Sequence, residues 1–147
     1  EIIYDIEAHF PYMKTVNNPH PETGISGSIR LGVEKIIELE EKCGKTGNRK
    51  REGCMFAVAD QPYLIRESLE NMVETWDVSK KGILVSENAG RMGNPVIFAC
   101  KYYEELKNLE GDVGGKCVLK KHLNDVQMFE MSASELKDLD SLTEIYE

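Results

Sequence analysis

The sequence predicts an α/β protein in which an open, mostly parallel sheet carries helices on both faces. Apolar segments with the character of strands alternate with segments of helical periodicity, and this alternation is typical of such sheets. The continuous apolar run at residues 54–59 is the second indication, because a run without alternation suits a central parallel strand covered on both faces. The length of 147 residues suits one domain, predicted over residues 1–147.

The first third of the chain is predicted to hold two helices and one short strand. Apolar residues at helical spacing open the chain: Ile2, Ile3, Ile6 and Phe10. Residues 13–16 are predicted as a strand that ends at a turn-rich Asn-Asn-Pro segment. A loop to Gly27 then leads into a second helix with one apolar stripe: Ile29, Val33, Ile36 and Ile37.

The remaining elements continue the alternation. The strand at 54–59 stops at an Asp-Gln-Pro segment, and the helix after it is predicted to pack on the sheet through apolar residues between 65 and 76. Further strands are predicted at 82–86, 95–99 and 126–131, and further helices at 102–109 and 115–123. Residues 141–144, Ser-Leu-Thr-Glu, match a capping box and predict a short last helix.

Charge and composition argue against several classes of function. The 18 Lys and Arg residues against 26 Asp and Glu residues give a net charge of −8, which does not suit a general nucleic-acid binder. The one dense basic stretch, residues 45–51, is interpreted as a solvated loop. No apolar run approaches the roughly 20 residues of a membrane span, and the N-terminus lacks signal-peptide features. A cytoplasmic protein without nucleic-acid or membrane partners is therefore predicted.

The four cysteines do not predict a metal site. Cys43, Cys54, Cys100 and Cys117 contain no Cys-x-x-Cys pair, whereas zinc sites usually show close pairs. Cytosolic thiols also stay reduced. The four residues are therefore predicted to be reduced and mostly buried.

Asp60 is the first candidate for a functional residue. Ligands of open α/β sheets bind beyond the carboxyl ends of the strands, and Asp60 directly follows the apolar strand. A carboxylate there can hold Mg²⁺, which takes one or two protein carboxylates together with phosphate oxygens and water. The alternative is that Asp60 caps a helix starting near Pro62.

Two further groups of residues are candidates. Asp138 and Asp140 lie two residues apart, so an extended segment puts both carboxylates on one side; they could complete a metal site with Asp60 or act as helix N-caps. Gly24, Ser26 and Ser28 stand at a helix start, where backbone N–H groups can receive an anion or the polar edge of a heterocycle.

Five blocks in order resemble the MobA-like nucleotidyltransferases, and within that family the molybdenum cofactor cytidylyltransferases. Residues 56–62 resemble the metal-binding strand end, and residues 18–32 the nucleobase loop with its helix. Residues 93–98 resemble the Gly-His-Pro strand, 109–116 the Gly-Asp-x-Gly-Ala-Arg turn, and 138–144 the closing acidic segment. Asn94 stands where the family has histidine, Lys116 where it has arginine, and Leu142 where it has proline.

The resemblance implies a three-layer Rossmann-like fold of the nucleotide-diphospho-sugar transferase type. The family's glycine-rich signature loop is absent from this sequence. A leading strand–helix–strand unit is therefore expected to precede residue 1 in a longer protein, and the 147 residues alone are expected to be inactive.

The resemblance also implies an Mg²⁺-dependent enzyme that transfers CMP or GMP from CTP or GTP to molybdopterin bearing molybdenum, with release of pyrophosphate. Asp60, with Asp138 or Asp140, would hold the metal. The nucleotide would meet Gly24, Ser26, Ser28 and Ala59, and the acceptor side would include Asn94, Pro95, Asp112 and Lys116. A molybdenum hydroxylase or its maturation factor is implied as a partner. Two alternatives stay open: a non-catalytic nucleotide-binding remnant, and a sugar-phosphate or isoprenoid-type nucleotidyltransferase of the same fold.

Overall fold

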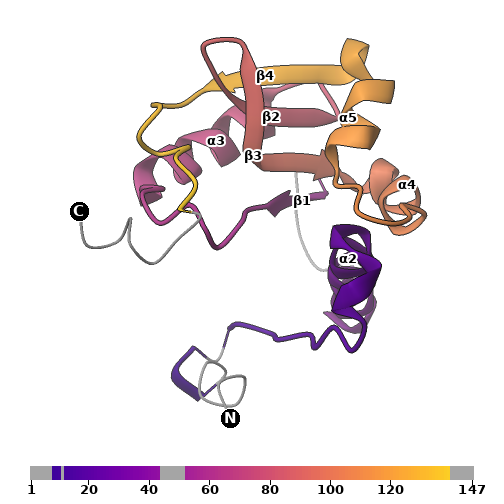
Figure 1. Ribbon diagram of the computed structural model, residues 1–147. Coiled ribbons are helices and arrows are strands. Elements are labelled where there is room, and N and C mark those ends of the chain that lie inside the picture. The colour runs from indigo at the N-terminus through magenta and orange to yellow at the C-terminus, as the bar shows by residue number, and fades with distance from the viewer. Residues whose placement is uncertain (1–7, 11, 44–51, 140–147) are drawn as a thin grey trace. The chain divides into compact units, whose positions relative to one another are not determined.

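The computed structural model describes residues 8–10, 12–43 and 52–139 (Figure 1). The chain divides into two compact units, one formed by residues 1–47 and 104–117 and the other by residues 48–103 and 118–147. The first is called the helical unit below and the second the sheet unit. One domain over the whole chain stays a prediction.

The helical unit is built around one long helix. The short 3-10 helix η1 (Pro21–Thr23) leads through Gly24 into α2 (Ile25–Cys43), and α4 (Tyr103–Lys107) lies almost entirely within the same unit. The second predicted helix is thus confirmed, although it begins before Gly27. Most of the helix predicted in the first ten residues lies outside the described residues. The strand predicted at 13–16 is wrong: these residues form no strand, and Met13 and Val16 are exposed, so the run buries too little apolar surface.

The sheet unit contains a four-stranded sheet among its described residues. Its strands are β1 (Gly53–Phe56), β2 (Ile83–Asn88), β3 (Arg91–Ala99) and β4 (Val126–Glu130), in the spatial order β1-β3-β2-β4. Strand β3 pairs antiparallel with β1 and with β2, whereas β2 and β4 are parallel. The prediction of a mostly parallel sheet is therefore wrong, because β2 and β3 form a hairpin rather than being joined by a crossover.

Strand β1 also corrects the interpretation of the apolar run at 54–59. Only residues 53–56 form the strand, all four are partly exposed, and within the described part of the chain β1 pairs with β3 alone. In the sheet formed by the described residues, it lies at the edge rather than at the centre. An apolar run does not report the number of neighbouring strands, so the sequence could not distinguish an edge strand from a central one.

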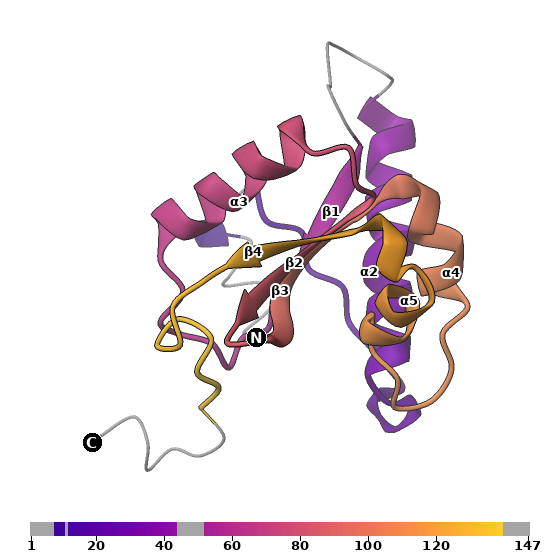
Figure 2. The same ribbon diagram turned by 90° about the horizontal axis from the view of Figure 1, so that it is seen from above.

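Helix α3 (Arg66–Val78) covers one face of the sheet (Figure 2). Its Met72 and Trp76 are buried against Leu84 of β2 and Ile97 of β3. Met55, Ala99 and Phe129 pack around this cluster. Phe98, which neighbours Ile97 and therefore faces the opposite side of the sheet, meets the rings of Phe56 and Tyr102 edge to face. The helix predicted between 65 and 76 and the strands predicted at 82–86, 95–99 and 126–131 are confirmed, although β3 begins at Arg91, four residues before the predicted start.

The segments between the last strands are short and helical. They are η2 (Cys100–Tyr102), α4, α5 (Lys116–Lys121) and η3 (Leu123–Asp125). Within the described ranges, no helix is long and apolar enough to cross a membrane. Cys54 and Cys117 are half-buried thiols and Cys100 is an exposed one, so the prediction of mostly buried cysteines is wrong for these three. Residues 141–144, with the predicted capping box, lie outside the described residues.

The Asp125 side chain, just before β4, contacts two residues that follow β3 in the sheet unit, Lys101 and Tyr102. Asp125 accepts a hydrogen bond of 2.5 Å from the Tyr102 hydroxyl and forms an ion pair with Lys101, whose Nζ lies 2.7 Å from Oδ2. Gly82 leaves room for this contact, since a Cβ there would meet the Asp125 carboxylate and approach the Tyr102 ring to 2.8 Å. Burial raises the pKa of Asp125, but the hydrogen bonds from Lys101, Tyr102 and Gly82 outweigh it and lower the pKa from 3.8 to about 2.

Asp125→Ala is expected to lower the free energy of unfolding by about 2 kcal/mol at pH 7, which is the lowering of the pKa expressed as energy. Because the folded pKa lies below the unfolded one, this contribution is present above pH 3.8 and is lost as the pH falls through about 2. Urea denaturation of both proteins between pH 7 and pH 2.5 measures the difference. A difference independent of pH would contradict the assignment.

Candidate functional site

Three of the four strands point in the same direction, and this defines one edge of the sheet as the candidate site. Strands β1 and β2 are both antiparallel to β3, and β4 is parallel to β2. The carboxyl ends of β1, β2 and β4 therefore lie at a common edge. Asp60 lies in the segment after β1 and Asp138 in the segment after β4, so both residues lie in segments that begin at this edge.

Asp60 lies in the turn between β1 and α3. Its side chain is exposed, and its backbone carbonyl accepts a hydrogen bond of 2.8 Å from the backbone N–H of Leu139. Helix α3 begins only at Arg66, and its N-cap residue, Ile65, has no side-chain capping bond. The interpretation of Asp60 as the cap of this helix is therefore wrong, and its carboxylate is left for another role.

Hydrogen bonds hold the first residue of the segment after β4 against the sheet. The backbone N–H of Met131 donates to the Glu87 carbonyl at 3.0 Å, and the Asn88 side-chain amide donates to the Met131 carbonyl at 2.7 Å. Both partners belong to the end of β2. The chain is thereby turned along the carboxyl edge of the sheet rather than away from it.

A buried carboxylate fixes the middle of the same segment. Glu135 is 9% exposed and accepts a hydrogen bond of 2.7 Å from the Ser132 hydroxyl. Burial raises the pKa of Glu135, but hydrogen bonds from Ser68, from Ser132 and from the backbone of Ile65 outweigh it and hold the pKa below its usual range. Ser68 and Ile65 belong to the first turn of α3 and its N-cap, where a negative charge is favourable. Glu135 therefore ties the segment to the start of α3.

Gln61 connects the end of this segment to Asp60. Its side-chain amide nitrogen, Nε2, lies 2.9 Å from Oδ1 of Asp138 and 3.5 Å from the Leu136 carbonyl oxygen. Gln61 is 8% exposed, whereas the side chain of Asp138 is exposed. Together with the bond between Leu139 and Asp60, these contacts bring Asp60, Gln61 and Asp138 into one cluster, called the acidic edge cluster below.

The donor set of the acidic edge cluster fits a hard divalent cation. Asp60 and Asp138 offer carboxylate oxygens, which Mg²⁺ and Mn²⁺ prefer. Among residues 8–10, 12–43 and 52–139, no three or more His, Cys, Asp or Glu side chains form a group that could hold a metal by themselves. Two carboxylates suit an ion that takes its remaining ligands from phosphates and water. Asp140, the third predicted ligand, lies outside the described residues.

The other candidate residues meet at the start of α2, within the helical unit. The backbone N–H of Ile25 points to Oδ1 of Asp112 at 3.4 Å. Gly24 packs so closely on residues 111–112 that a Cβ would lie 2.7 Å from the Asp112 Cα. Ser26 is buried and Ser28 is exposed. Asp112, predicted for the acceptor side, therefore shares this loop with the residues predicted for the nucleotide.

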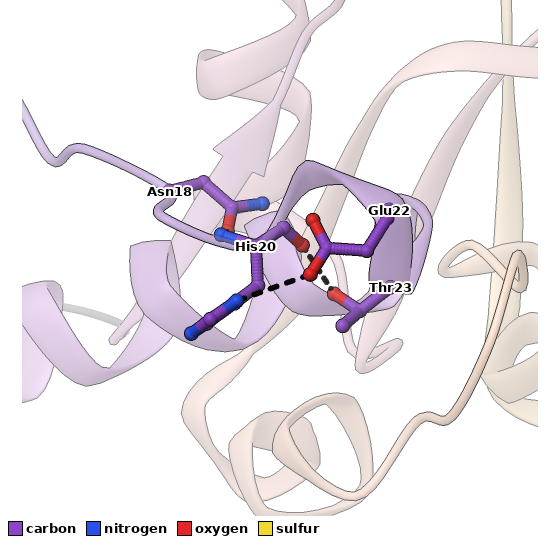
Figure 3. A network of polar contacts seen from close by, with 4 residues as sticks. All are labelled: Asn18, His20, Glu22 and Thr23. Carbon is purple, nitrogen blue, oxygen red and sulfur yellow. Dashed lines mark hydrogen bonds and ion pairs between the residues drawn. The ribbon is translucent and has the colours of Figure 1, made fainter.

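A network of polar side chains shapes the loop before α2 (Figure 3). The Asn18 carbonyl oxygen accepts from the His20 backbone N–H at 3.0 Å, and the Asn18 amide donates to the Ser28 hydroxyl at 3.1 Å. The Thr23 hydroxyl donates to the His20 carbonyl, and His20 pairs with Glu22 at 3.1 Å. Most of these groups are exposed, so the loop presents polar atoms to solvent.

Four predicted residues take part in none of the contacts described above. Asn94 and Pro95 form a β-bulge in β3, since Val85 pairs with Val96 while Ser86 pairs with Gly93. Asn94 is half-buried and Pro95 fully buried. Ala59 is exposed in the turn before Asp60, and Lys116 is exposed at the first position of α5. Their predicted roles stay predictions.

The sequence prediction missed Gln61 and Glu135 as parts of the site. Gln61 gave a weak signal, as a polar residue between the candidate Asp60 and a proline at the end of a strand. Glu135 gave a stronger one, because Ser132 and Glu135 have the Ser-x-x-Glu spacing of a capping box. Neither signal indicates the long-range partner, which comes from chain far away in the sequence.

Comparisons with known proteins agree with this fold. Residues 4–126 match the family model described as the MobA-like NTP transferase domain; Asp138 lies beyond the matched residues. No curated protein matches the sequence significantly.

Among solved structures, the chain is similar to Rv0371c from Mycobacterium tuberculosis H37Rv, with a TM-score of 0.61 and 20% identity over 82% of this chain and 57% of that chain. A crystal structure of Rv0371c in complex with manganese has a TM-score of 0.60 and 18% identity over 81% of this chain and 58% of that chain. The homologue of Rv0371c from Mycobacterium sp. strain JC1 has a TM-score of 0.60 and 18% identity over 81% of this chain and 54% of that chain. This chain thus spans a little more than half the length of each of these structures. The family match, which covers most of the sequence, shows that the chain belongs to the MobA-like NTP transferase domain family.

Proposed function

We propose that the protein is a divalent-metal-dependent nucleotidyltransferase that moves CMP, or GMP, from the nucleoside triphosphate to the phosphate of the molybdenum cofactor, molybdopterin bearing molybdenum. Membership of the MobA-like NTP transferase family supports nucleotidyl transfer. The resemblance of residues 56–62 to the cytidylyltransferases supports this choice of acceptor. The observation that carries the proposal is the acidic edge cluster, because it offers two carboxylates where ligands of such sheets bind.

The metal proposed for the acidic edge cluster is Mg²⁺ or Mn²⁺. A similar structure, that of Rv0371c, has been determined in complex with manganese. Asp60 and Asp138 would hold the ion, and Asp140 is the further candidate. When bound, such an ion neutralises charge that develops on the triphosphate during transfer.

The chain's own residues would bind and orient the two substrates. In the reaction, a phosphate oxygen of the acceptor attacks the α-phosphorus of the triphosphate, the bond between the α- and β-phosphates breaks, and pyrophosphate leaves. The exposed polar loop with Ser28 and Asn18, next to the helix N-terminus at Gly24, would receive the nucleobase through hydrogen bonds. Glu135 and Gln61 would keep the segment that carries Asp138 in position during this exchange.

Product analysis with the full-length protein tests the proposal. With Mg²⁺, radiolabelled CTP or GTP and the molybdenum cofactor, we expect release of pyrophosphate and a labelled dinucleotide form of the cofactor. Parallel reactions with sugar 1-phosphates and an isoprenoid phosphate serve as controls for the acceptor. Transfer to one of these instead would contradict the acceptor, and nucleotide binding without any turnover would contradict the enzymatic proposal altogether.

A further inference from the structure

We infer that Gln61 is a positioning residue, whose side-chain amide holds the Asp138 carboxylate in place for a divalent cation at the acidic edge cluster. The inference rests on the proposed function, because it assumes that Asp60 and Asp138 are metal ligands. It concerns a residue that touches neither substrate nor reacting atoms and acts only through Asp138.

The orientation of the Gln61 amide follows from its partners. Oδ1 of Asp138 and the carbonyl oxygen of Leu136 are both acceptors, so the amide nitrogen must face them. The amide oxygen, Oε1, then points elsewhere, and it has no hydrogen-bond partner among the residues that the structure describes. Gln61 thus keeps its two donor contacts while its own amide oxygen, a buried acceptor, has no hydrogen-bond partner among the described residues.

The unsatisfied Oε1 lowers the stability of the fold, which suggests that Gln61 serves another purpose. A buried acceptor without a partner loses its hydrogen bonds to water and gains none in exchange. The unsatisfied Oε1 therefore offsets part of the stability that the two donor contacts contribute. An apolar side chain of similar length would fill the same space at no such cost.

The effect on Asp138 is specific. Asp138 is exposed and would otherwise sample several rotamers. The bond from Gln61 engages Oδ1 and restricts the side chain, which leaves Oδ2 as the oxygen available to a cation. The Leu139–Asp60 backbone bond keeps the two segments adjacent. Groups that orient a metal ligand in this way typically change metal affinity by 10- to 100-fold when they are removed.

Titration of free Mn²⁺ by electron paramagnetic resonance, with the full-length protein and the metal alone, tests the inference. Gln61→Leu is expected to weaken Mn²⁺ binding by about tenfold or more, with a melting temperature close to that of the wild type. Gln127→Leu is the matched control, since Gln127 accepts a hydrogen bond from Ser79 in the same unit away from the cluster. It should bind Mn²⁺ like the wild type.

Two further variants separate the possible failures. Asp60→Asn and Asp138→Asn should each weaken Mn²⁺ binding, and adding Gln61→Leu to Asp138→Asn should weaken it by less than twofold further, because Gln61 acts through Asp138. If both Asp variants lose affinity but Gln61→Leu does not, the inference is wrong and the metal site stands. If neither Asp variant loses affinity, the metal site itself is wrong. Should Gln61→Leu fail to fold, Gln61→Met replaces it, and unchanged affinity of the folded protein overturns the inference.

Discussion

Asp60→Asn is expected to reduce nucleotidyl transfer by the full-length protein by a factor of about 100 or more, and to leave its melting temperature nearly unchanged. The loss corresponds to the roughly 3 kcal/mol that one electrostatic stabiliser of a transition state supplies. Stability should not fall, because the Asp60 side chain is exposed and does not cap α3, and the bond to Leu139 uses its backbone. Asn preserves that backbone contact and the side-chain shape, so only the negative charge is removed.

Turnover measured against Mg²⁺ concentration, with a thermal melt of the same sample, checks this result. The control is Asp77→Asn, which removes an exposed carboxylate from α3 in the same unit, and it should transfer nucleotide like the wild type. Activity of Asp60→Asn close to that of the control would exclude Asp60 as a metal ligand. A melting temperature that falls in parallel with activity would indicate a structural role instead.

Gly24→Ala is expected to cost about 3 kcal/mol of stability or more. Gly24 has a φ of +83° and a ψ of −175°, a region of backbone conformation that is essentially restricted to glycine. An added Cβ would also lie 2.7 Å from the Cα and 2.8 Å from the backbone nitrogen of Asp112. Backbone strain and overpacking each cost roughly 1–3 kcal/mol, and backbone atoms cannot yield as a flexible side chain does.

Gly32→Ala is the matched control within the same unit. Gly32 lies inside α2 and a Cβ there would meet nothing within 4 Å, so alanine should stabilise the helix by about 0.5–1 kcal/mol. Thermal and urea denaturation of both variants measure the contrast. Equal stability of Gly24→Ala and Gly32→Ala would show that the contact between Gly24 and residues 111–112 is not tight.

Most individual elements could be predicted from periodicity alone. Met72 and Trp76 lie four residues apart and are both buried on the sheet side of α3, which is the spacing that predicted this helix. The apolar residues of β2 and of the second half of β3 are buried as their sequence indicated. The strand predicted at residues 13–16 is wrong because the run contains only two strongly apolar residues, and both are exposed.

The candidate site was predicted in part. Asp60 could be chosen because it directly follows a strand, at the edge where ligands of α/β sheets bind. Asp138 could be chosen because its spacing from Asp140 puts both carboxylates on one side of an extended segment. The sequence left open whether Asp60 caps a helix, and the start of α3 at Arg66 excludes that. Gln61 could not be identified, since its partners Leu136 and Asp138 are 75 and 77 residues away and no local pattern links them.

The sequence by itself determined most of the helices and strands and the family of the fold, and it indicated Asp60 and Asp138 as candidate metal ligands. These depend on local spacing, on side-chain chemistry and on the order of motifs along the chain. Only the tertiary structure decided that β3 runs antiparallel to β1 and β2, that β1 lies at the edge of the sheet formed by the described residues and that Gln61 donates a hydrogen bond to Asp138. Strand order and long-range hydrogen bonds depend on how distant segments pack against one another, and a run of apolar residues carries no information about which neighbour it will meet.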